Sequence, residues 1–114
     1  MRIRRSKNPN KKTDTELYNL IIERIRDGDY VFLTHAKQRL IDRNILDIDV
    51  ISILEGRKGY SRKRNKSKDK YENGMQDWNY CFEGCNADSE KIRIIISFDN
   101  NLLLLIITVI KLTK

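Results

Sequence analysis

The spacing of apolar residues changes once along this chain, and that change constrains the fold more than any other feature of the sequence. Before Gly56, apolar residues recur every three or four positions, which is the period of an α-helix. After Gly56, they alternate with polar residues or form short apolar runs, which is typical of β-strands. Helices followed by an antiparallel meander predict an α+β domain whose small antiparallel sheet is covered on one face by the N-terminal helices.

The first two helices have sequence signals at their starts. Thr13 and Glu16 have the spacing of a capping box, which predicts a first helix at residues 14–26. Thr34 is a favoured N-cap residue and predicts a second helix at residues 35–43. Both helices carry apolar residues at helical spacing, so each is expected to bury one face against the sheet.

Two shorter segments complete the first half of the chain. The apolar run at residues 30–33 is expected to form a connector or a brief strand. A third helix is expected to begin at Asp47 and to end at Gly56, because glycine readily adopts the left-handed backbone conformation that terminates helices.

The second half of the chain predicts strands. In the segment DWNYCFEG, aromatic residues occupy alternate positions, so the core face of one strand is expected to bury Trp78, Tyr80 and Phe82. Residues 91–98 and 102–112 are expected to pair through a tight hairpin, because the intervening DNN sequence tolerates positive φ angles. A further strand is expected near residues 58–62, and the charged segment RKRNKSKDKYENGMQ, between this strand and Trp78, is expected to be a loop.

The charge of the chain favours polyanionic partners. A formal net charge of +7 and a pI of about 9.5 suit nucleic acid, an acidic protein or an anionic membrane. The apolar run at residues 102–110 is shorter than the roughly 18 residues of a membrane helix. Residues 1–12 form a basic arm with no apolar stretch after it, so we expect a mobile arm, no secretory signal and a cytoplasmic protein. A single domain is expected at residues 13–114.

Metal-binding residue types are scarce in this chain. Two cysteines and one histidine are too few ligands for a structural zinc site. Cys81 and Cys85 are expected to be reduced and packed, because an extended strand holds their sulfur atoms roughly 13 Å apart. We therefore expect neither a metal ion nor a cofactor.

The segment THAKQRLIDRNI contains the single histidine and two arginines at helical spacing. A helix would place His35, Arg39 and Arg43 in one row at the edge of its apolar face. Such a row can bind phosphate oxygens, or it can form surface ion pairs with nearby aspartates, and the sequence leaves both readings open. At the start of a helix the helix dipole disfavours a charged imidazole, which would leave His35 available as a base.

Three further features are compatible with nucleic-acid binding. Thr108 is the one polar residue in the apolar run 102–110, and its hydroxyl must find a partner. The cations after Gly56 could contact phosphates, although such a run is also typical of a solvated loop. Trp78 is assigned mainly to the core, but it begins a strand and could be within reach of a base. The candidate RNA-contacting residues are Arg57, Lys58, Arg62, Lys63, Arg64, Lys66 and Trp78.

The segment HAKQRLIDRNILDIDVISILEG resembles the H-x-x-x-R-x-x-x-R motif of a small bacterial family of domains of unknown function that is grouped with MqsR-like and RelE-like toxins. The segments DWNYCFEG and LLIITVIKL are similar to the W-x-Y-x-x-x-G and I-T-V elements of that family. This resemblance covers residues 16–112 and implies a RelE/barnase-like α+β fold, metal-independent cleavage of RNA and a partner antitoxin. By position, the motif residues are His35, Arg39, Arg43, Trp78, Tyr80, Gly84 and Thr108.

We therefore expect a toxin-type endoribonuclease, an mRNA interferase of a toxin-antitoxin system, acting on RNA that is free or bound to the ribosome. His35 would be the general base or acid, and Arg39 and Arg43 would neutralise the charge of the transition state. Thr108 or Tyr80 would orient the phosphate. One histidine cannot donate and accept a proton at once, so Tyr80 or a loop lysine would supply the second transfer. The alternative is a non-catalytic module that binds nucleic acid or an acidic protein through the same cationic surface.

Overall fold

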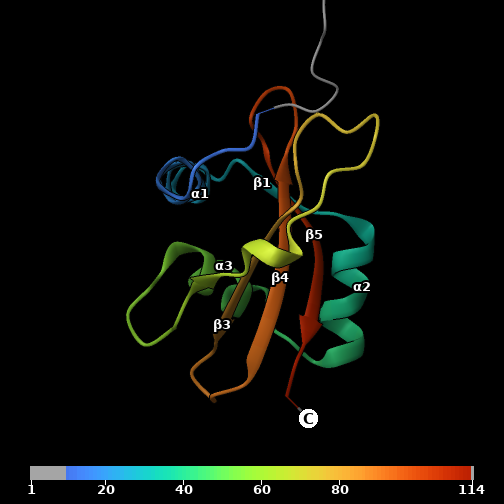
Figure 1. The fold of residues 1–114 in the computed structure, drawn as a ribbon. Helices are drawn as coiled ribbons and strands as arrows, with labels where there is room; N and C mark the ends of the chain where they lie inside the picture. The colour runs from blue at the N-terminus through green and yellow to red at the C-terminus, as the bar shows by residue number, and fades with distance from the viewer. Residues whose placement is uncertain (1–9, 114) are drawn as a thin grey trace, which may run out of the picture.

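The computed structural model describes residues 10–113, so most of the predicted basic arm at residues 1–12 lies outside the described residues. Three α-helices, one 3-10 helix and five strands make up this part of the chain, which is an α+β fold (Figure 1). In chain order the elements are α1 (Asp14–Arg26), β1 (Tyr30–Phe32), α2 (Thr34–Arg43), α3 (Asp47–Glu55), β2 (Lys63–Arg64), η1 (Lys66–Lys68), β3 (Tyr80–Cys85), β4 (Lys91–Phe98) and β5 (Leu104–Lys111).

The helix termini follow local sequence signals at α1 and α3. Thr13 and Glu16 form the expected capping box at the start of α1, with the Thr13 hydroxyl accepting from the Glu16 amide at 3.2 Å. Helix α3 ends at Gly56, which adopts a left-handed conformation with φ of 72°. The prediction for α2 was wrong at its first residue. Leu33 is the N-cap, and Thr34 is already helical, so its side chain does not cap the helix.

The five strands form one mixed sheet in the order β1-β5-β4-β3-β2. The expected hairpins pair antiparallel, β3 with β4 and β4 with β5. The sheet is not purely antiparallel, because the short run before α2 forms a strand that pairs parallel with β5. This parallel pairing is possible because the long connection from β1 to β5, which includes α2, α3 and strands β2 to β4, brings the chain back to the end of the sheet at which β1 begins.

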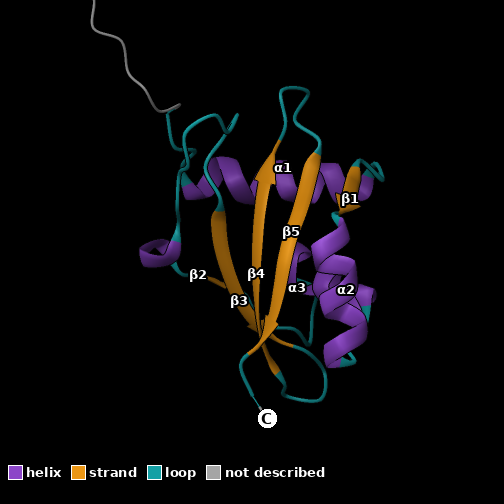
Figure 2. Cartoon of the chain, turned by 90° about the vertical axis from the view of Figure 1, so that its right-hand side faces the viewer, coloured by secondary structure: helices purple, strands orange, loops and turns teal. Residues whose placement is uncertain are grey.

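Helices α1 and α3 cover one face of the sheet, and Figure 2 shows both behind the strands. Their apolar side chains pack on alternate residues of β3, β4 and β5 in one continuous core. Helix α2 has a different position. Strand β1 pairs only with the first part of β5, and α2 packs beside the rest of β5, where it covers an edge that would otherwise be unpaired (Figure 2).

On the opposite face of the sheet, no α-helix of residues 10–113 packs across the strands, and we call this face the open face (Figures 1 and 2). A β-bulge between β4 and β5 shapes it, because Thr108 pairs with Ile95 and Ile106 pairs with Ile96, which leaves Ile107 as an extra residue. The open face is formed by Cys81, Glu83, Arg93, Ile95, Ser97, Leu105, Ile107, Thr108 and Ile110.

Two predictions about the connections were wrong. The expected strand near residues 58–62 lies slightly later, at β2, and η1 lies within the segment expected to be a loop. In the β4–β5 hairpin, Leu102 rather than an asparagine adopts the positive φ, at 62°. The Asp99 carboxylate accepts from the amides of Asn101 and Leu103 at 2.8 and 2.9 Å, so a side chain holds this turn.

Candidate nucleic-acid interface

His35 and Arg39 are adjacent on the first turns of α2. The Arg39 Nε donates to the His35 Nε2 at 3.5 Å, a long hydrogen bond between two residues one helical turn apart. Arg43 lies one further turn along the helix and is exposed, as is His35. Leu33, directly before α2, lines a cavity on the open face, so the end of α2 that carries His35 borders this face.

The aspartates near the row bind other partners. Asp42 accepts from Gln38 at 2.9 Å, and Asp49 accepts from the Tyr60 hydroxyl at 3.3 Å. Within residues 10–113, no ion pair joins His35, Arg39 or Arg43 to a carboxylate. The surface ion-pair reading of this row therefore has no support in the geometry, and the row is available to an anion.

Thr108 lies on β5, the strand against which α2 packs. It opposes Ile95, so its half-buried side chain faces the open side of the sheet. The two cavities described next are lined neither by Thr108 nor by the α2 row. The row and Thr108 thus lie on neighbouring elements, but neither cavity is shared by them.

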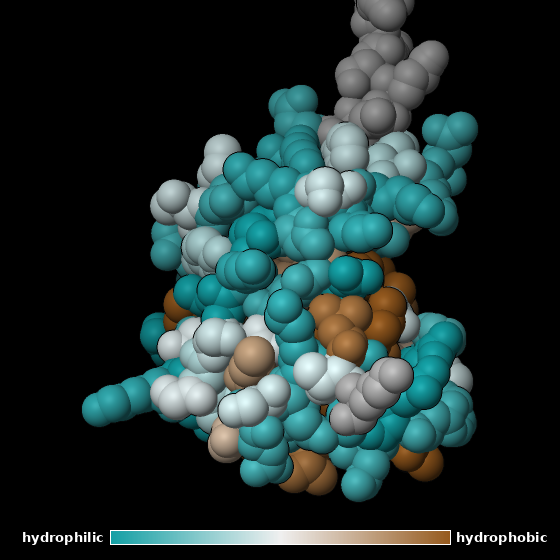
Figure 3. Space-filling model, turned by 60° about the horizontal axis from the view of Figure 1, so that its bottom comes forward, coloured by the Kyte–Doolittle hydropathy of each residue, from teal (hydrophilic) through white to brown (hydrophobic). Residues whose placement is uncertain are grey.

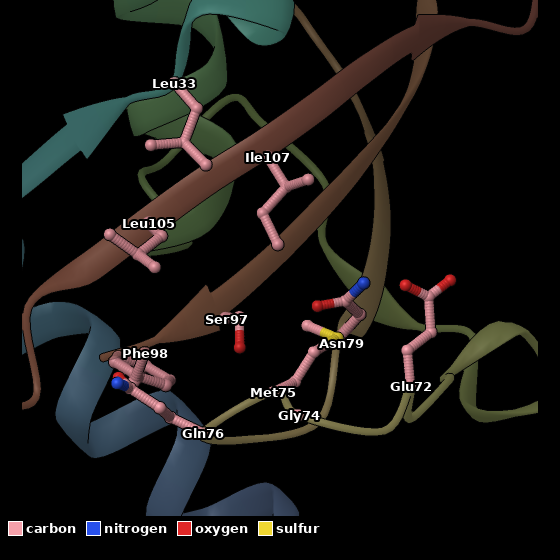
Figure 4. A pocket seen from close by; sticks show the side chains of 10 residues that line it. All are labelled: Leu33, Glu72, Gly74, Met75, Gln76, Asn79, Ser97, Phe98, Leu105 and Ile107. Carbon is pink, nitrogen blue, oxygen red and sulfur yellow. The ribbon is translucent and has the colours of Figure 1, made fainter. Parts of the chain in front are cut away.

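The open face contains two cavities that meet at Asn79. The first has a volume of about 480 Å³, and Figure 4 shows its lining side chains, which come from the 72–79 segment, the ends of β4 and β5, and Leu33 before α2. The second has a volume of about 410 Å³ and is lined by Ser67, Lys68, Asp69, Lys70, Asn79, Arg93, Ile95 and Ile110. Figure 3 shows a hydrophobic area recessed among hydrophilic side chains on the lower side of the molecule.

Two of the predicted RNA-contacting arginines have structural contacts instead. The Arg62 guanidinium lies 4.0 Å from the ring centroid of Tyr18 and donates to the Leu54 carbonyl at 2.7 Å. Only 5% of the Arg64 side chain is exposed, and it is ion-paired with Asp69 and Asp14. Both arginines hold the 61–70 segment on the domain, so neither is free to contact a phosphate.

The other predicted cations remain on the surface. Arg57 pairs with Glu55, and Lys66 lies 3.4 Å from an Asp14 oxygen. Lys58 and Lys63 are exposed, and no ion pair of theirs is found within the described part of the chain. These four residues stay candidates for contact with a polyanion.

Tyr80 has a structural position. Its ring is fully buried, and its hydroxyl donates to Asp77 Oδ1 at 2.7 Å and accepts from the Lys12 amide at 3.0 Å. Burial raises the pKa of this phenol, and the neighbouring Asp77 carboxylate raises it further. A side chain with no exposed surface cannot reach a phosphate, so we assign Tyr80 to the core and not to catalysis.

Residues 11 and 12, at the end of the predicted N-terminal arm, are attached to the domain. Lys12 Nζ lies 2.6 Å from Asp77 Oδ2, and Lys11 Nζ lies 2.8 Å from Asp69 Oδ2. Lys11 also lies 5.0 Å from the centroid of the Trp78 ring, and Tyr71 packs on the same ring at 5.9 Å. Trp78 is half-buried against the core, which agrees with its assignment mainly to the core.

The two cysteines are free, as expected, with Cys81 buried and Cys85 half-buried. Burial raises the pKa of the Cys81 thiol to about 11, so this thiol is unreactive near neutral pH. Within residues 10–113, no cluster of three or more His, Cys, Asp or Glu side chains could hold a metal ion. No helix in this range is long and apolar enough to cross a membrane.

Sequence reasoning missed Asn79, Lys68, Lys70 and Arg93 as a group. One signal was present, because Arg93 interrupts the apolar strand KIRIIISF on the face opposite the core. Asn79 also alternates with the core aromatic residues, which assigns it to the open side. Asn79 lies near Lys68 and Lys70 because the 65–70 segment crosses the sheet at this point. No local sequence pattern indicates that crossing.

Comparison with known protein families supplies one match. The model of a domain of unknown function, DUF4258, matches residues 32–111, which include the last residue of β1, all of α2 and the strands β2 to β5. No curated protein and no solved structure matches the chain. Because the matched region spans most of the sequence, the chain belongs to the DUF4258 family.

Proposed function

We propose that this domain binds single-stranded RNA across the open face and cleaves it as a metal-independent, toxin-type endoribonuclease. The observation that carries the proposal is the contact between His35 and Arg39 at the end of α2 that borders the open face. An imidazole next to a guanidinium, with no carboxylate bound to either among the described residues, suits a substrate that is itself anionic.

The proposed reaction is transfer within the RNA chain. When the phosphate binds, the Arg39 guanidinium turns from His35 Nε2 to the phosphate oxygens, and the freed Nε2 accepts the proton of the ribose 2′-hydroxyl, whose oxygen forms a bond to the adjacent phosphorus. The bond between phosphorus and the 5′-oxygen breaks, and that oxygen takes up a proton from water. The products are a 2′,3′-cyclic phosphate and a 5′-hydroxyl. Arg39 neutralises the charge that develops on the non-bridging oxygens.

Arg43 has a separate role in this proposal. It lies two helical turns after His35, which is about 12 Å along the axis, so it contacts a neighbouring phosphate rather than the reacting one. Thr108 lies on the open face and would orient the RNA strand through its hydroxyl. Tyr80 has no part, because it is buried in the core.

The toxin role and the antitoxin partner rest on the resemblance to MqsR-like and RelE-like toxins. One feature of the surface supports a protein partner. Ile41, Leu46 and Ile48 are exposed by 74%, 60% and 48%, and they lie close together in sequence around the junction of α2 and α3. An antitoxin that covers these side chains would remove apolar surface from water.

A second candidate function is RNA binding without cleavage. One observation favours it, because within the described residues His35 contacts no second acid or base that could protonate the leaving oxygen. A positioned acid-base group typically contributes on the order of 100- to 10,000-fold in rate. A site with one such group is therefore a slow ribonuclease at best, or a binding site.

Cleavage of a labelled oligonucleotide separates the two candidates. Purified protein is incubated in EDTA with a single-stranded RNA, with the same RNA fully 2′-O-methylated and with the matching DNA. We expect only the unmodified RNA to be cut, with a 2′,3′-cyclic phosphate at the new end. Binding of all three without cleavage supports the second candidate, and cleavage of the methylated RNA or the DNA contradicts the proposed chemistry.

A further inference from the structure

The cavity next to Leu33 has the properties of a nucleobase site. Its volume of about 480 Å³ is within the range of about 300–1,000 Å³ that is usual for small-molecule sites. The apolar wall contains Leu33, Met75, Phe98, Leu105 and Ile107 (Figure 4). The β-bulge makes Ile107 an extra residue on β5. Ile107 and Thr108 therefore both face the open side, and the spacing of β5 against β4 is wider at this point.

One polar side chain in this cavity lacks a partner. The Asn79 Oδ1 is buried and forms no hydrogen bond within the described residues. The Asn79 backbone is fixed, because it exchanges two hydrogen bonds with Lys70 at 2.7 and 3.0 Å. Buried acceptors are nearly always satisfied in proteins, so an acceptor without a partner, on a fixed backbone beside a cavity, points to a ligand that donates a hydrogen bond.

The neighbouring cavity carries positive charge. Lys68 and Lys70 are exposed, and no ion pair of theirs is found among the residues that the structure describes. Arg93 binds Glu83 through its Nε at 2.9 Å. Asp69 lines the same cavity, but Arg64 and Lys11 neutralise its carboxylate. This second cavity therefore favours a phosphate, and Asn79 lines both cavities.

We propose that one nucleotide of the RNA lies across Asn79, with its base in the apolar cavity and its phosphate beside Lys68 and Lys70. The proposal rests on the RNA binding proposed above and names the base that is read. Asparagine pairs through both ends of its amide with the N6 amino group and N7 of adenine, so adenine is the expected base. Glu72 lines the base cavity beside Asn79 (Figure 4), and its carboxylate repels a phosphate there, which favours the base in this cavity.

Fluorescence anisotropy with labelled RNA oligomers of adenosine, uridine and 7-deazaadenosine tests this site. A good bidentate pair discriminates by about 10-fold, so we expect the adenosine oligomer to bind about 10-fold more tightly than the uridine oligomer. The 7-deaza oligomer, which lacks the N7 acceptor, is expected to lose most of this preference. Asn79→Leu should abolish the preference while the Kd for the uridine oligomer stays within about twofold.

Leu33→Trp provides a second variant, because Leu33 is partly exposed at the cavity and a larger side chain there fills the space. It should also remove the adenosine preference. Gln38→Ala, on an exposed part of α2, is the matched control and should keep it. Equal binding of all oligomers by the parent protein, or an adenosine preference that survives both variants, overturns the base site while RNA binding stands. No binding of any oligomer overturns the base site and the proposed function together.

Discussion

Arg64 and Asp69 form a two-point ion pair beneath the 65–70 segment. Arg64 Nη1 donates to Asp69 Oδ1 at 2.9 Å, and Nη2 donates to Oδ2 at 2.5 Å. Only 5% of the arginine side chain and 1% of the aspartate side chain are exposed. Asp69 also accepts from the Cys81 amide at 2.8 Å. This pair attaches the cationic segment to β3, so it positions Lys68 and Lys70 over the open face.

Removing one member of this pair should destabilise the domain. Arg64→Ala leaves the Asp69 carboxylate buried without its main partner, and breaking a buried ion pair typically costs about 3–5 kcal/mol. Urea denaturation followed by circular dichroism measures the loss in the free energy of unfolding. Lys63→Ala, at the exposed neighbouring position, is the control and should change it by less than about 0.5 kcal/mol. Similar effects of both variants would contradict the structural role of Arg64.

The same pair predicts how stability depends on pH. Burial raises the pKa of Asp69, but hydrogen bonds from Arg64 and Lys11 outweigh this and hold its pKa below the usual value. A carboxyl whose folded-state pKa is lowered contributes stability that is present above its unfolded-state pKa of about 3.9 and is lost as the pH falls through the folded-state pKa.

The parent protein should therefore be more stable than Asp69→Asn at neutral pH, and the difference should shrink as the pH falls below about 4. Urea titrations of both proteins from neutral to acidic pH measure this difference. An advantage of the parent protein that stays constant down to a pH of about 2 would assign the effect to packing instead of charge.

Gly84 should tolerate no larger residue. A Cβ at this position would lie 2.1 Å from the Ser61 carbonyl oxygen and 2.6 Å from the Ile53 Cγ2. The chain before β2 crosses β3 at this point, so Gly84→Ala forces the backbone apart and is expected to cost about 1–3 kcal/mol or more. Thermal unfolding checks this, with Cys85→Ala at the adjacent, half-buried position as control. A melting temperature for Gly84→Ala equal to that of the control would show that the crossing adapts.

The sequence predicted the elements whose determinants are local. The capping box of α1 and Gly56 after α3 each act within a few residues, and both predictions were confirmed. The alternation in β3 likewise assigned Tyr80 and Phe82 to the core face. The parallel pairing of β1 was not predicted, because it depends on contacts with β5, more than 70 residues later.

The site was harder to predict from the sequence because charge runs do not show which cations are already paired. Lys63, Arg64 and Lys66 are close neighbours in sequence, yet Arg64 is nearly buried and the two lysines are exposed. Long-range partners decide this difference, since Asp14 lies 50 residues away from Arg64. The spacing of His35 and Arg39 did predict that the two residues are adjacent, because one helical turn fixes it.

RNA binding should depend on salt through Lys68 and Lys70. Each phosphate contact to a single strand contributes about 0.7 to the slope of log K against log salt concentration, so replacing both lysines with alanine should reduce the slope by about 1.4. Anisotropy with a uridine oligomer at several salt concentrations measures this slope. Lys91→Ala, exposed at the start of β4, is the control and should leave the slope unchanged. An unchanged slope in the double variant would show that the strand follows another path.

The most direct test of the central claim is the rate of RNA cleavage by His35→Ala relative to the parent protein, measured in EDTA with enzyme in excess. Gln38→Ala, another exposed position on α2, serves as the control, and circular dichroism establishes that all three proteins are folded. Loss of a positioned acid-base group costs on the order of 100- to 10,000-fold in rate, so cleavage by His35→Ala should fall by at least about 100-fold while the control keeps the parent rate. A folded His35→Ala protein that cuts RNA at the parent rate would contradict the account.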